Sequence, residues 1–409
     1  SGEVRVPADR TIFPRTTGAT ATLVQKLGNA VKKAAESKSS SWWYTPHMAT
    51  ASRAIAERIP LVDIVLEVRD ARVRINCLRR FQFQSSLVRI SITSDQVPWS
   101  SRCALLKNLP LSSNRIIVLN KMDLANRLQL KEWMKYSEEQ NCISYGVNSH
   151  NKENIKEFLN FLQARVKELK KIDDSSHTTT VMLVGIPNVG KSALANSLHL
   201  IGRTSPAEKG RLKHAVVSPQ PGETKDISNL KIASHPNVYV LDTPGVLPPE
   251  ILETEMCSKL ALTGVIADSL VGESELAQYF LTILNLNDEY KDWEKLSTSE
   301  SEGLLLDQKR GGSELKGSRK RQNPTDHTQD FVVRDVRRTL FQVISSFNRK
   351  LEDEEEMSLL IELQFRALQK AFHLPSESGE DAHTRVATKL LNLYRTGSLG
   401  HYTLDSIPG

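Results

Sequence analysis

A glycine-rich segment between an apolar run and a helix-forming run constrains the fold more than any other feature of this chain. It reads Gly185-Ile-Pro-Asn-Val-Gly190-Lys191-Ser192, after TTTVMLV and before ALANSL. Its glycines allow backbone N–H groups to close around phosphate oxygens, and the N-terminus of the following helix adds positive potential. The lysine is expected to reach the β- and γ-phosphates and the serine to bind Mg²⁺. The pattern therefore predicts a phosphate-binding loop in a strand–loop–helix unit.

A second phosphate-side motif, Asp242-Thr-Pro-Gly245, follows the apolar run VYVL. An aspartate at the end of a strand, on the same sheet edge as the phosphate loop, can hold Mg²⁺ through water. Gly245 lacks a side chain and can approach a γ-phosphate closely. Between these motifs, PGETKD supplies Thr224, which is either an Mg²⁺ ligand that senses the γ-phosphate or an ordinary loop residue. The expected magnesium ligands are therefore Ser192, Thr224 and Asp242.

A base-reading motif precedes the phosphate loop instead of following it. Asn120-Lys121-Met122-Asp123 comes after the apolar run RIIVL. A carboxylate at the last position can accept two hydrogen bonds from guanine, a pair that adenine cannot donate. Asn120 is expected to tie this loop to the phosphate loop, and the stem of Lys121 to cover the base. VNSH, after the next predicted strand, adds a weaker candidate loop for the guanine O6, with Asn148 and Ser149.

Strands alternate with helices from residue 42 to 250, which predicts an α/β domain with a mostly parallel sheet. One predicted helix carries its apolar residues at helical spacing: Ile155, Phe158, Leu159, Leu162 and Val166. Residues 251–295 read as a helical connector and 296–330 as a flexible, basic and polar insertion. Residues 331–409 return to helical periodicity and predict an all-helical C-terminal domain.

Composition limits the remaining possibilities. The chain has a formal net charge of +6 and a pI near 9.0, which fits an RNA or acidic partner without requiring one. Its four cysteines form no C-x-x-C pair, so thiols in a reducing compartment are expected. No apolar run approaches 18 residues, which argues against a membrane-spanning helix. Residues 1–41 are basic and fit a transit-like leader, a disordered arm or a sequence left by gene prediction or cloning.

The motif order resembles that of the circularly permuted GTPases: guanine motif, phosphate loop, PGETKD, then DTPG. Asp70-Ala-Arg72, after the run VDIVLEV, resembles the YlqF/RbgA branch, as do WWYTPHMATASRAIAERI, KLALTGVIAD and LGHYTLD. The resemblance covers about residues 42–295 and 331–406, and is greatest to the mitochondrial and organellar DAR GTPases. It implies a permuted Ras-like P-loop domain followed by a helical domain. It also implies GTP hydrolysis during assembly of the large ribosomal subunit.

The resemblance also suggests what replaces a missing catalytic group. Val246 follows DTPG, where Ras-like enzymes carry a water-orienting glutamine, so intrinsic turnover should be slow. His47, in WWYTPHMA, matches a histidine that is proposed to orient water on the ribosome; its alternative is a helix-start or packing role. The family usually reads W-F-P-G-H-M there, which this chain does not. Asn188 matches a K⁺-binding asparagine, with a loop-shaping hydrogen bond as the alternative.

The residues expected to contact the nucleotide or its metal are, in full, Asn120, Lys121, Met122, Asp123, Asn148, Ser149, Pro187, Asn188, Val189, Gly190, Lys191, Ser192, Ala193, Thr224, Asp242 and Gly245.

Two basic regions are candidates for RNA contact. One is residues 308–322, where a solvated linker is the alternative, and the other is the helix near 331–350 with Arg334, Arg337, Arg338, Arg349 and Lys350. Residues 73–113 do not map onto the family pattern.

The expected partners are large-subunit rRNA and ribosomal proteins, membrane contact is at most peripheral, and the protein is expected to be a monomer. A mitochondrial matrix location is expected, with chloroplast or cytoplasm as alternatives. A GTP-dependent switch for a protein partner and a slow-hydrolysing scaffold remain alternative functions.

Overall fold

The computed structural model describes residues 46–72, 114–173, 178–202, 227–247 except 235, 254–294 except 287, 331–375 except 350 and 352, and 380–401. It also describes the single positions 25, 29, 33 and 404. The described residues form two compact units, one within Lys32–Val271 and His401–Gly409 and the other chiefly within Gly272–Gly400. The predicted connector 251–295 is therefore divided between the units. Residues 73–113, Thr224 and residues 308–322 lie outside the described part.

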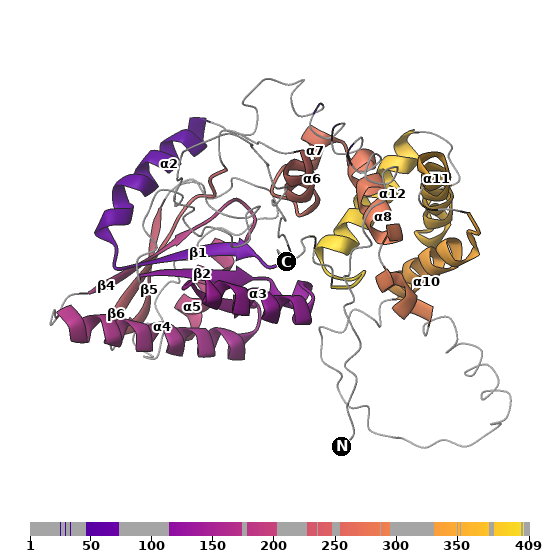
Figure 1. Cartoon of the computed structure of the whole chain (residues 1–409). Helices are drawn as coiled ribbons and strands as arrows, with labels where there is room; N and C mark the ends of the chain where they lie inside the picture. The colour runs from indigo at the N-terminus through magenta and orange to yellow at the C-terminus, as the bar shows by residue number, and fades with distance from the viewer. Residues whose placement is uncertain are drawn as a thin grey trace, which may run out of the picture. The chain divides into compact units, whose positions relative to one another are not determined.

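The first unit is built on a six-stranded sheet in the order β3-β2-β1-β4-β6-β5 (Figure 1). Neighbouring strands are parallel except β5 and β6, which pair antiparallel across a tight connection. The predicted mostly parallel α/β fold is thereby confirmed. The strands are β1 Ile64–Asp70, β2 Arg115–Asn120, β3 Ile143–Val147, β4 Thr179–Val184, β5 Ser228–Ser234 and β6 Asn237–Asp242.

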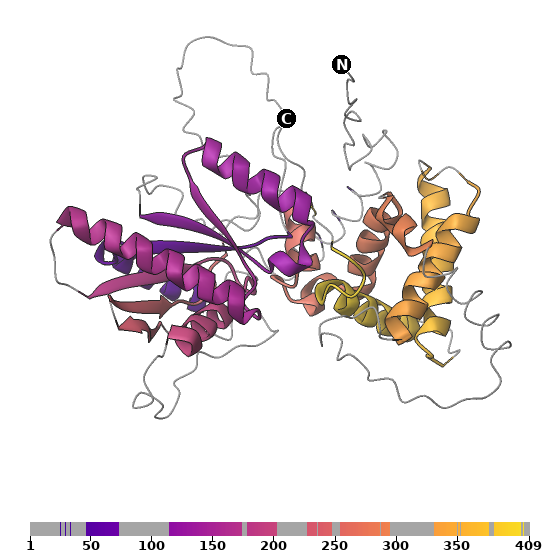
Figure 2. The same cartoon turned by 90° about the horizontal axis from the view of Figure 1, so that it is seen from below.

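The central strands are buried on both faces, which explains their nearly continuous apolar sequences. Every residue of β2 is buried, and six of the seven in β1. Helix α2 packs on Met182 and Val184 of β4, and α3 packs on Ile117 and Leu119 of β2. The strand register places these residues on one face. Helices α4 and α5 lie side by side on the other side of the sheet from α2 (Figures 1 and 2).

Helix positions agree with the sequence periodicity. The five apolar residues predicted to share one face of α4 are all buried. The helices of this unit are α2 Pro46–Arg58, α3 Arg127–Glu139, α4 Lys152–Asp173, α5 Lys191–Gly202, α6 Thr254–Leu262 and α7 Asp268–Val271, with short 3₁₀ turns η1 Ile59–Leu61 and η3 Met122–Leu124. Leu404 also belongs to this unit: it is buried, and its amide donates to the Arg72 carbonyl oxygen at 2.8 Å.

The second unit is helical throughout its described residues. Helix α8 packs on α12, and α10 on α11. Inside it, the side-chain amides of Asn285 and Gln364 exchange two hydrogen bonds, of 3.0 and 2.7 Å. This exchange satisfies two buried polar groups that would otherwise be costly. The elements are α8 Glu273–Leu286, η5 Asp288–Trp293, α10 Phe331–Ser346, α11 Glu354–Ala371 and α12 Glu380–Arg395.

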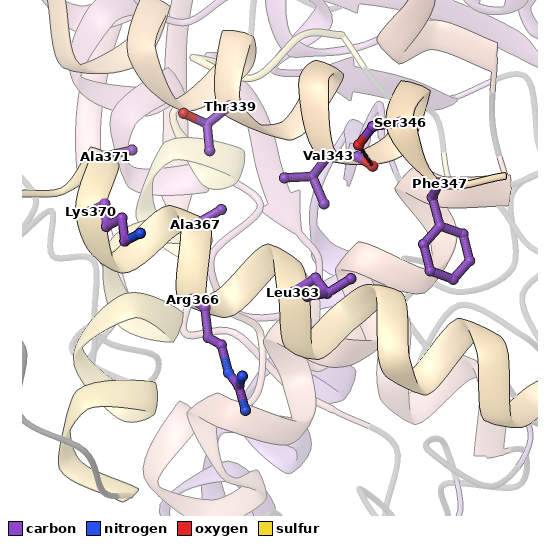
Figure 3. Close-up of a pocket in the computed structure, with 9 residues that line it drawn as sticks. All are labelled: Thr339, Val343, Ser346, Phe347, Leu363, Arg366, Ala367, Lys370 and Ala371. Atoms are coloured by element: carbon purple, nitrogen blue, oxygen red, sulfur yellow. Dashed lines mark hydrogen bonds between the residues drawn. The ribbon is translucent and has the colours of Figure 1, made fainter. Parts of the chain in front are cut away.

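A groove of about 500 Å³ lies between α10 and α11 (Figure 3). Its apolar lining includes Val343, Leu363 and Ala367, with Arg366 and Lys370 among its polar residues. No acidic residue lines it. Throughout the described part of the chain, no helix is both long and apolar enough to cross a bilayer.

Candidate nucleotide site

The predicted motifs follow strands that are neighbours in the sheet. Asn120 ends β2, Asp70 ends β1, the phosphate loop follows β4, and Asp242 ends β6. These strands are parallel, so their carboxyl ends lie along one sheet edge. Chain order reverses between β1 and β4, and a crevice at such a switch point is the usual ligand position in open α/β sheets. The sheet therefore gathers motifs that are widely separated in the sequence.

Asn120 joins the guanine-type loop to the phosphate loop. Its side-chain amide donates to the Val189 carbonyl at 2.8 Å, and its oxygen accepts from the Ser149 hydroxyl at 2.8 Å. The Ser149 carbonyl in turn accepts from Ser197 of α5 at 2.7 Å. A Cβ atom on Gly190 would lie only 2.3 Å from the Asn120 amide nitrogen. Only glycine therefore allows this approach, and the tie expected from the sequence is present.

Lys121 makes a second connection between the two loops. Its backbone is left-handed, with φ of 59°. Its ammonium donates to the Asn188 carbonyl at 2.6 Å and lies 3.0 Å from the Asp70 carboxylate. The next two residues, Met122 and Asp123, start the short turn η3, and Asp123 is exposed. A base lying against this loop could thus reach a solvent-facing carboxylate.

The lysine of the phosphate loop has a buried side chain. Lys191 is only 5% exposed, and its ammonium donates to the carbonyls of Gly185 and Ile186 at 3.0 and 2.8 Å. It is the first residue of α5, so positive charge and the helix N-terminus coincide. Pro187 and Val189 are also buried in the loop. This arrangement suits a phosphate-binding loop.

Asp242 meets the requirements of a magnesium ligand. The side chain is fully buried, and neither carboxylate oxygen has a hydrogen-bond partner among the described residues. Burial raises its pKa, while Ser192 and Lys191 oppose that change. The Ser192 hydroxyl and the Thr243 backbone N–H are thus close to the carboxylate. A buried carboxylate without partners is costly unless a cation neutralises it. Together with the Ser192 hydroxyl and phosphate oxygens, it suits a hard, oxygen-preferring ion such as Mg²⁺.

The segment after Asp242 lies against the phosphate loop. A Cβ on Gly245 would come within 2.6 Å of the backbone of Pro187, so only glycine fits there. Val246 is 3% exposed and packs in an apolar cluster with Ala51 and Ile55 of α2. Its side chain therefore lies in the core and offers no polar atom to a water molecule.

The remaining predicted residues differ in their surroundings. His47 is exposed near the start of α2. Asn188 has a positive φ of 58°, and its side-chain amide donates to the Gly264 carbonyl at 2.6 Å, which is the loop-shaping role. Asn148 stabilises its own loop: its backbone N–H donates to Asn154, and its side chain accepts from the His150 amide.

The arginines proposed for RNA contact, on α10 and just after it, have partners within the chain. Arg337 donates twice to the Ser398 carbonyl, at 2.9 and 2.6 Å, and Arg338 pairs with Asp335 at 2.9 Å. Arg349 pairs with Glu356, also at 2.9 Å, and Arg334 lies over the Phe331 ring. These side chains therefore contribute to the helical unit itself. Lys350 lies outside the described residues.

One set of contacts in the site was not predicted. The sequence identifies the Asp70-Ala-Arg72 segment only as a family signature, yet the Asp70 carboxylate contacts Lys121 of the guanine-type loop. The sequence signal for this contact is a pair of oppositely charged residues at the end of a buried strand. That end lies on the sheet edge that carries the other motifs.

The fold and the site together define a P-loop GTP-binding protein with permuted chain order. Residues 180–299 match the family model described as "50S ribosome-binding GTPase". The matched region begins in β4, before the phosphate loop, and does not include the guanine-type motif at 120–123. The protein "DAR GTPase 2, mitochondrial" of Arabidopsis thaliana is 55% identical over 94% of this chain and 95% of its own length.

Two more distant relatives are also similar. "Mitochondrial ribosome-associated GTPase 1" of Mus musculus is 34% identical over 59% of this chain and 66% of its own length. "Ribosome biogenesis GTPase A" of Bacillus cereus is 27% identical over 77% of this chain and 98% of its own length. This chain belongs to the DAR GTPases, circularly permuted GTPases of the YlqF/RbgA type.

Proposed function

We propose that this GTPase assists assembly of the large subunit of the mitochondrial ribosome. The names of its relatives carry the proposal: one is ribosome-associated and mitochondrial, one is a ribosome biogenesis GTPase, and the relative that is 55% identical is mitochondrial. The matching family is described as binding the 50S subunit. GTP is the substrate. Mg²⁺ is proposed to bind with it, because the buried Asp242 carboxylate has no hydrogen-bond partner among the described residues.

The contacts at the sheet edge support the proposed nucleotide roles. Asp123 reads guanine from its exposed turn, and Asn120 and Lys121 hold that turn to the phosphate loop. Lys191 and the N-terminus of α5 bind the β- and γ-phosphates. Ser192 and Asp242 hold the metal, with Thr224 as a further ligand. When bound, Mg²⁺ neutralises the charge that develops on the phosphates.

Slow intrinsic hydrolysis is part of the proposal. Val246 stands where a water-orienting glutamine would be, and its side chain is buried against α2. Another group must therefore orient the attacking water. His47, exposed on the same helix, supplies it when the ribosome is bound. K⁺ at Asn188 is the alternative; the amide of that residue already donates to Gly264, so only its oxygen would bind the ion.

The test is GTP turnover by the full chain with and without purified mitochondrial large subunits, in K⁺ and in Na⁺. Stimulation by large subunits and not by unrelated RNA is expected. Co-sedimentation with large subunits in a GTP analogue, and release in GDP, is also expected. Turnover that large subunits leave unchanged would favour a slow-hydrolysing scaffold, which the buried Val246 makes the second candidate. Binding in neither nucleotide state would favour a switch for a protein partner.

A further inference from the structure

The carboxylate of Asp70 occupies a central position among the nucleotide loops. It ends β1, the strand between β2, which leads to the guanine-type loop, and β4, which leads to the phosphate loop. Asp70 pairs in register with Asn120 at the end of β2, and the Ala71 amide donates to the Asn120 carbonyl at 2.8 Å. The carboxylate therefore stands where the two loops must be joined.

Asp70 is only 2% exposed, and its carboxylate is bound from two directions. Arg72 grips both oxygens: its backbone N–H and Nε donate to one at 3.0 Å each, and its terminal nitrogen to the other at 2.9 Å. The Lys121 ammonium contacts that second oxygen at 3.0 Å. Burial alone would favour the protonated acid, but the two cations keep the pKa of Asp70 below its ordinary value. The group is thus a fixed anion inside the fold.

Lys121 links the Asp70 carboxylate to the phosphate loop. Its ammonium also donates to the Asn188 carbonyl in the phosphate loop, at 2.6 Å. Removing the Asp70 charge would leave two cations close together, the buried Arg72 and the partly exposed Lys121. Such an unbalanced charge is strongly unfavourable, so Lys121 would turn toward solvent and leave Asn188.

We propose that Asp70 is a positioning residue for the nucleotide: it fixes Lys121 against the phosphate loop and thereby holds the guanine-reading loop in its binding position. Arg72 orients the Asp70 carboxylate. The inference rests on the nucleotide site described under the proposed function, and it does not depend on the ribosome. It gives the Asp-Ala-Arg segment a physical role beyond that of a family signature.

The position of β1 in the sheet makes such a bridge possible. The base-reading and phosphate-binding loops come from distant parts of the chain, and β1 separates their strands in the sheet. A hydrogen-bonded anion at the end of the intervening strand can hold both loops, and charged hydrogen bonds are the stronger kind.

The test is a double-mutant cycle in the full chain, with release of fluorescently labelled GDP measured by stopped flow. Asp70→Asn and Lys121→Met should each speed GDP release, Asp70→Asn by about tenfold, as expected when a charged hydrogen bond is lost. The double variant should release GDP no faster than Lys121→Met alone, because Asp70 acts through Lys121. Effects that simply multiply would overturn the proposal and leave Asp70 a merely structural residue.

Asp63→Asn is the matched control. Asp63 immediately precedes β1, at the end of the strand away from the loops, is exposed, and accepts a hydrogen bond from the Thr180 amide. The Asp63→Asn variant should release GDP at the wild-type rate.

If Asp70→Asn does not fold, Asp70→Glu replaces it in the cycle. This variant keeps the charge but displaces it, and the same non-additive result is expected. Wild-type protein that binds no labelled GDP would overturn the nucleotide site and this inference together. Unchanged turnover with ribosomes would overturn only the assembly role.

Discussion

The side-chain amide of Asn188 donates a hydrogen bond to the carbonyl of Gly264, 2.6 Å away, and so joins the phosphate loop to the turn after α6. Gly264 has a φ of 77°, a conformation that favours glycine. The loop that binds phosphate is therefore in direct contact with the segment that leads out of the GTPase unit. Changes in the loop on nucleotide binding can reach that segment without an intermediate residue.

Asn188→Ala should uncouple the two segments. In the wild-type protein, GDP binding is expected to slow hydrogen exchange of backbone amides in residues 259–268, and in the variant this protection should shrink. Asn126→Ala, which removes the side-chain cap of α3, is the control and should leave the protection intact. Equal protection in wild type and Asn188→Ala would show that the contact transmits nothing.

Glu67→Gln should destabilise the GTPase unit without being part of the nucleotide site. Glu67 is fully buried and binds Arg69 and Arg115. Burial opposes its ionisation, but the two arginines lower its pKa from 4.5 to about 2. The folded protein therefore binds fewer protons than the unfolded chain, and this stabilisation is complete above pH 4.5 and lost as the pH falls toward about 2.

Urea titrations at several pH values provide the measurement for Glu67. At neutral pH the variant should lose on the order of 3 kcal/mol of unfolding free energy, because two arginines lose their charged partner. The difference between wild type and variant should shrink in acid. A difference that stays constant with pH would mean that the charge of Glu67 is not what stabilises the strand.

Asp242→Asn should separate stability from metal dependence. Among the described residues the wild-type carboxylate is buried without a hydrogen-bond partner, so the nearly isosteric amide removes an unfavourable charge. In nucleotide-free, Mg²⁺-free protein, the variant should unfold at an equal or higher temperature, because it no longer buries a charge. Its affinity for GTP should no longer increase when Mg²⁺ is added. Clear destabilisation of the metal-free variant would show that the carboxylate has stabilising partners.

His47→Ala tests the proposed water-orienting group. His47 is exposed, so the variant should fold and bind GTP and GDP like the wild type. Turnover in the presence of large subunits should fall about a hundredfold or more, in the range found for general acid–base groups, while turnover without them stays unchanged. Gln342→Ala, an exposed substitution on α10, serves as a surface control. Stimulated rates that survive His47→Ala would assign this residue to the helix start alone.

Local pattern was sufficient to predict much of this fold. The buried face of α4 follows from helical spacing, and the pairing of β5 with β6 follows from two apolar runs around a short turn. The apolar run VDIVLEV, residues 62–68, overlaps β1, which spans Ile64–Asp70 and follows the 3₁₀ turn η1 at Ile59–Leu61. Asn120 was expected to contact the phosphate loop, and it does.

Contacts between distant charged residues could not be predicted in the same way. Nothing in the spacing of Asp70 and Lys121 shows that their strands are neighbours in register. Likewise, the arginines of α10 indicated a basic surface, but Arg337 and Arg338 bind groups of their own unit. Periodicity reveals which face of an element is buried, whereas partners across the fold depend on topology.

Base selectivity of Asp123→Asn tests most directly the central claim that two separated parts of this chain form one nucleotide site. Competition against labelled GDP should show lost preference for GTP and gained affinity for XTP, whose additional carbonyl accepts a hydrogen bond where guanine donates one. Adding Lys191→Ala, in the other part of the chain, should abolish binding of both nucleotides. An Asp123→Asn protein that still selects GTP, or one whose XTP binding survives Lys191→Ala, would contradict the account.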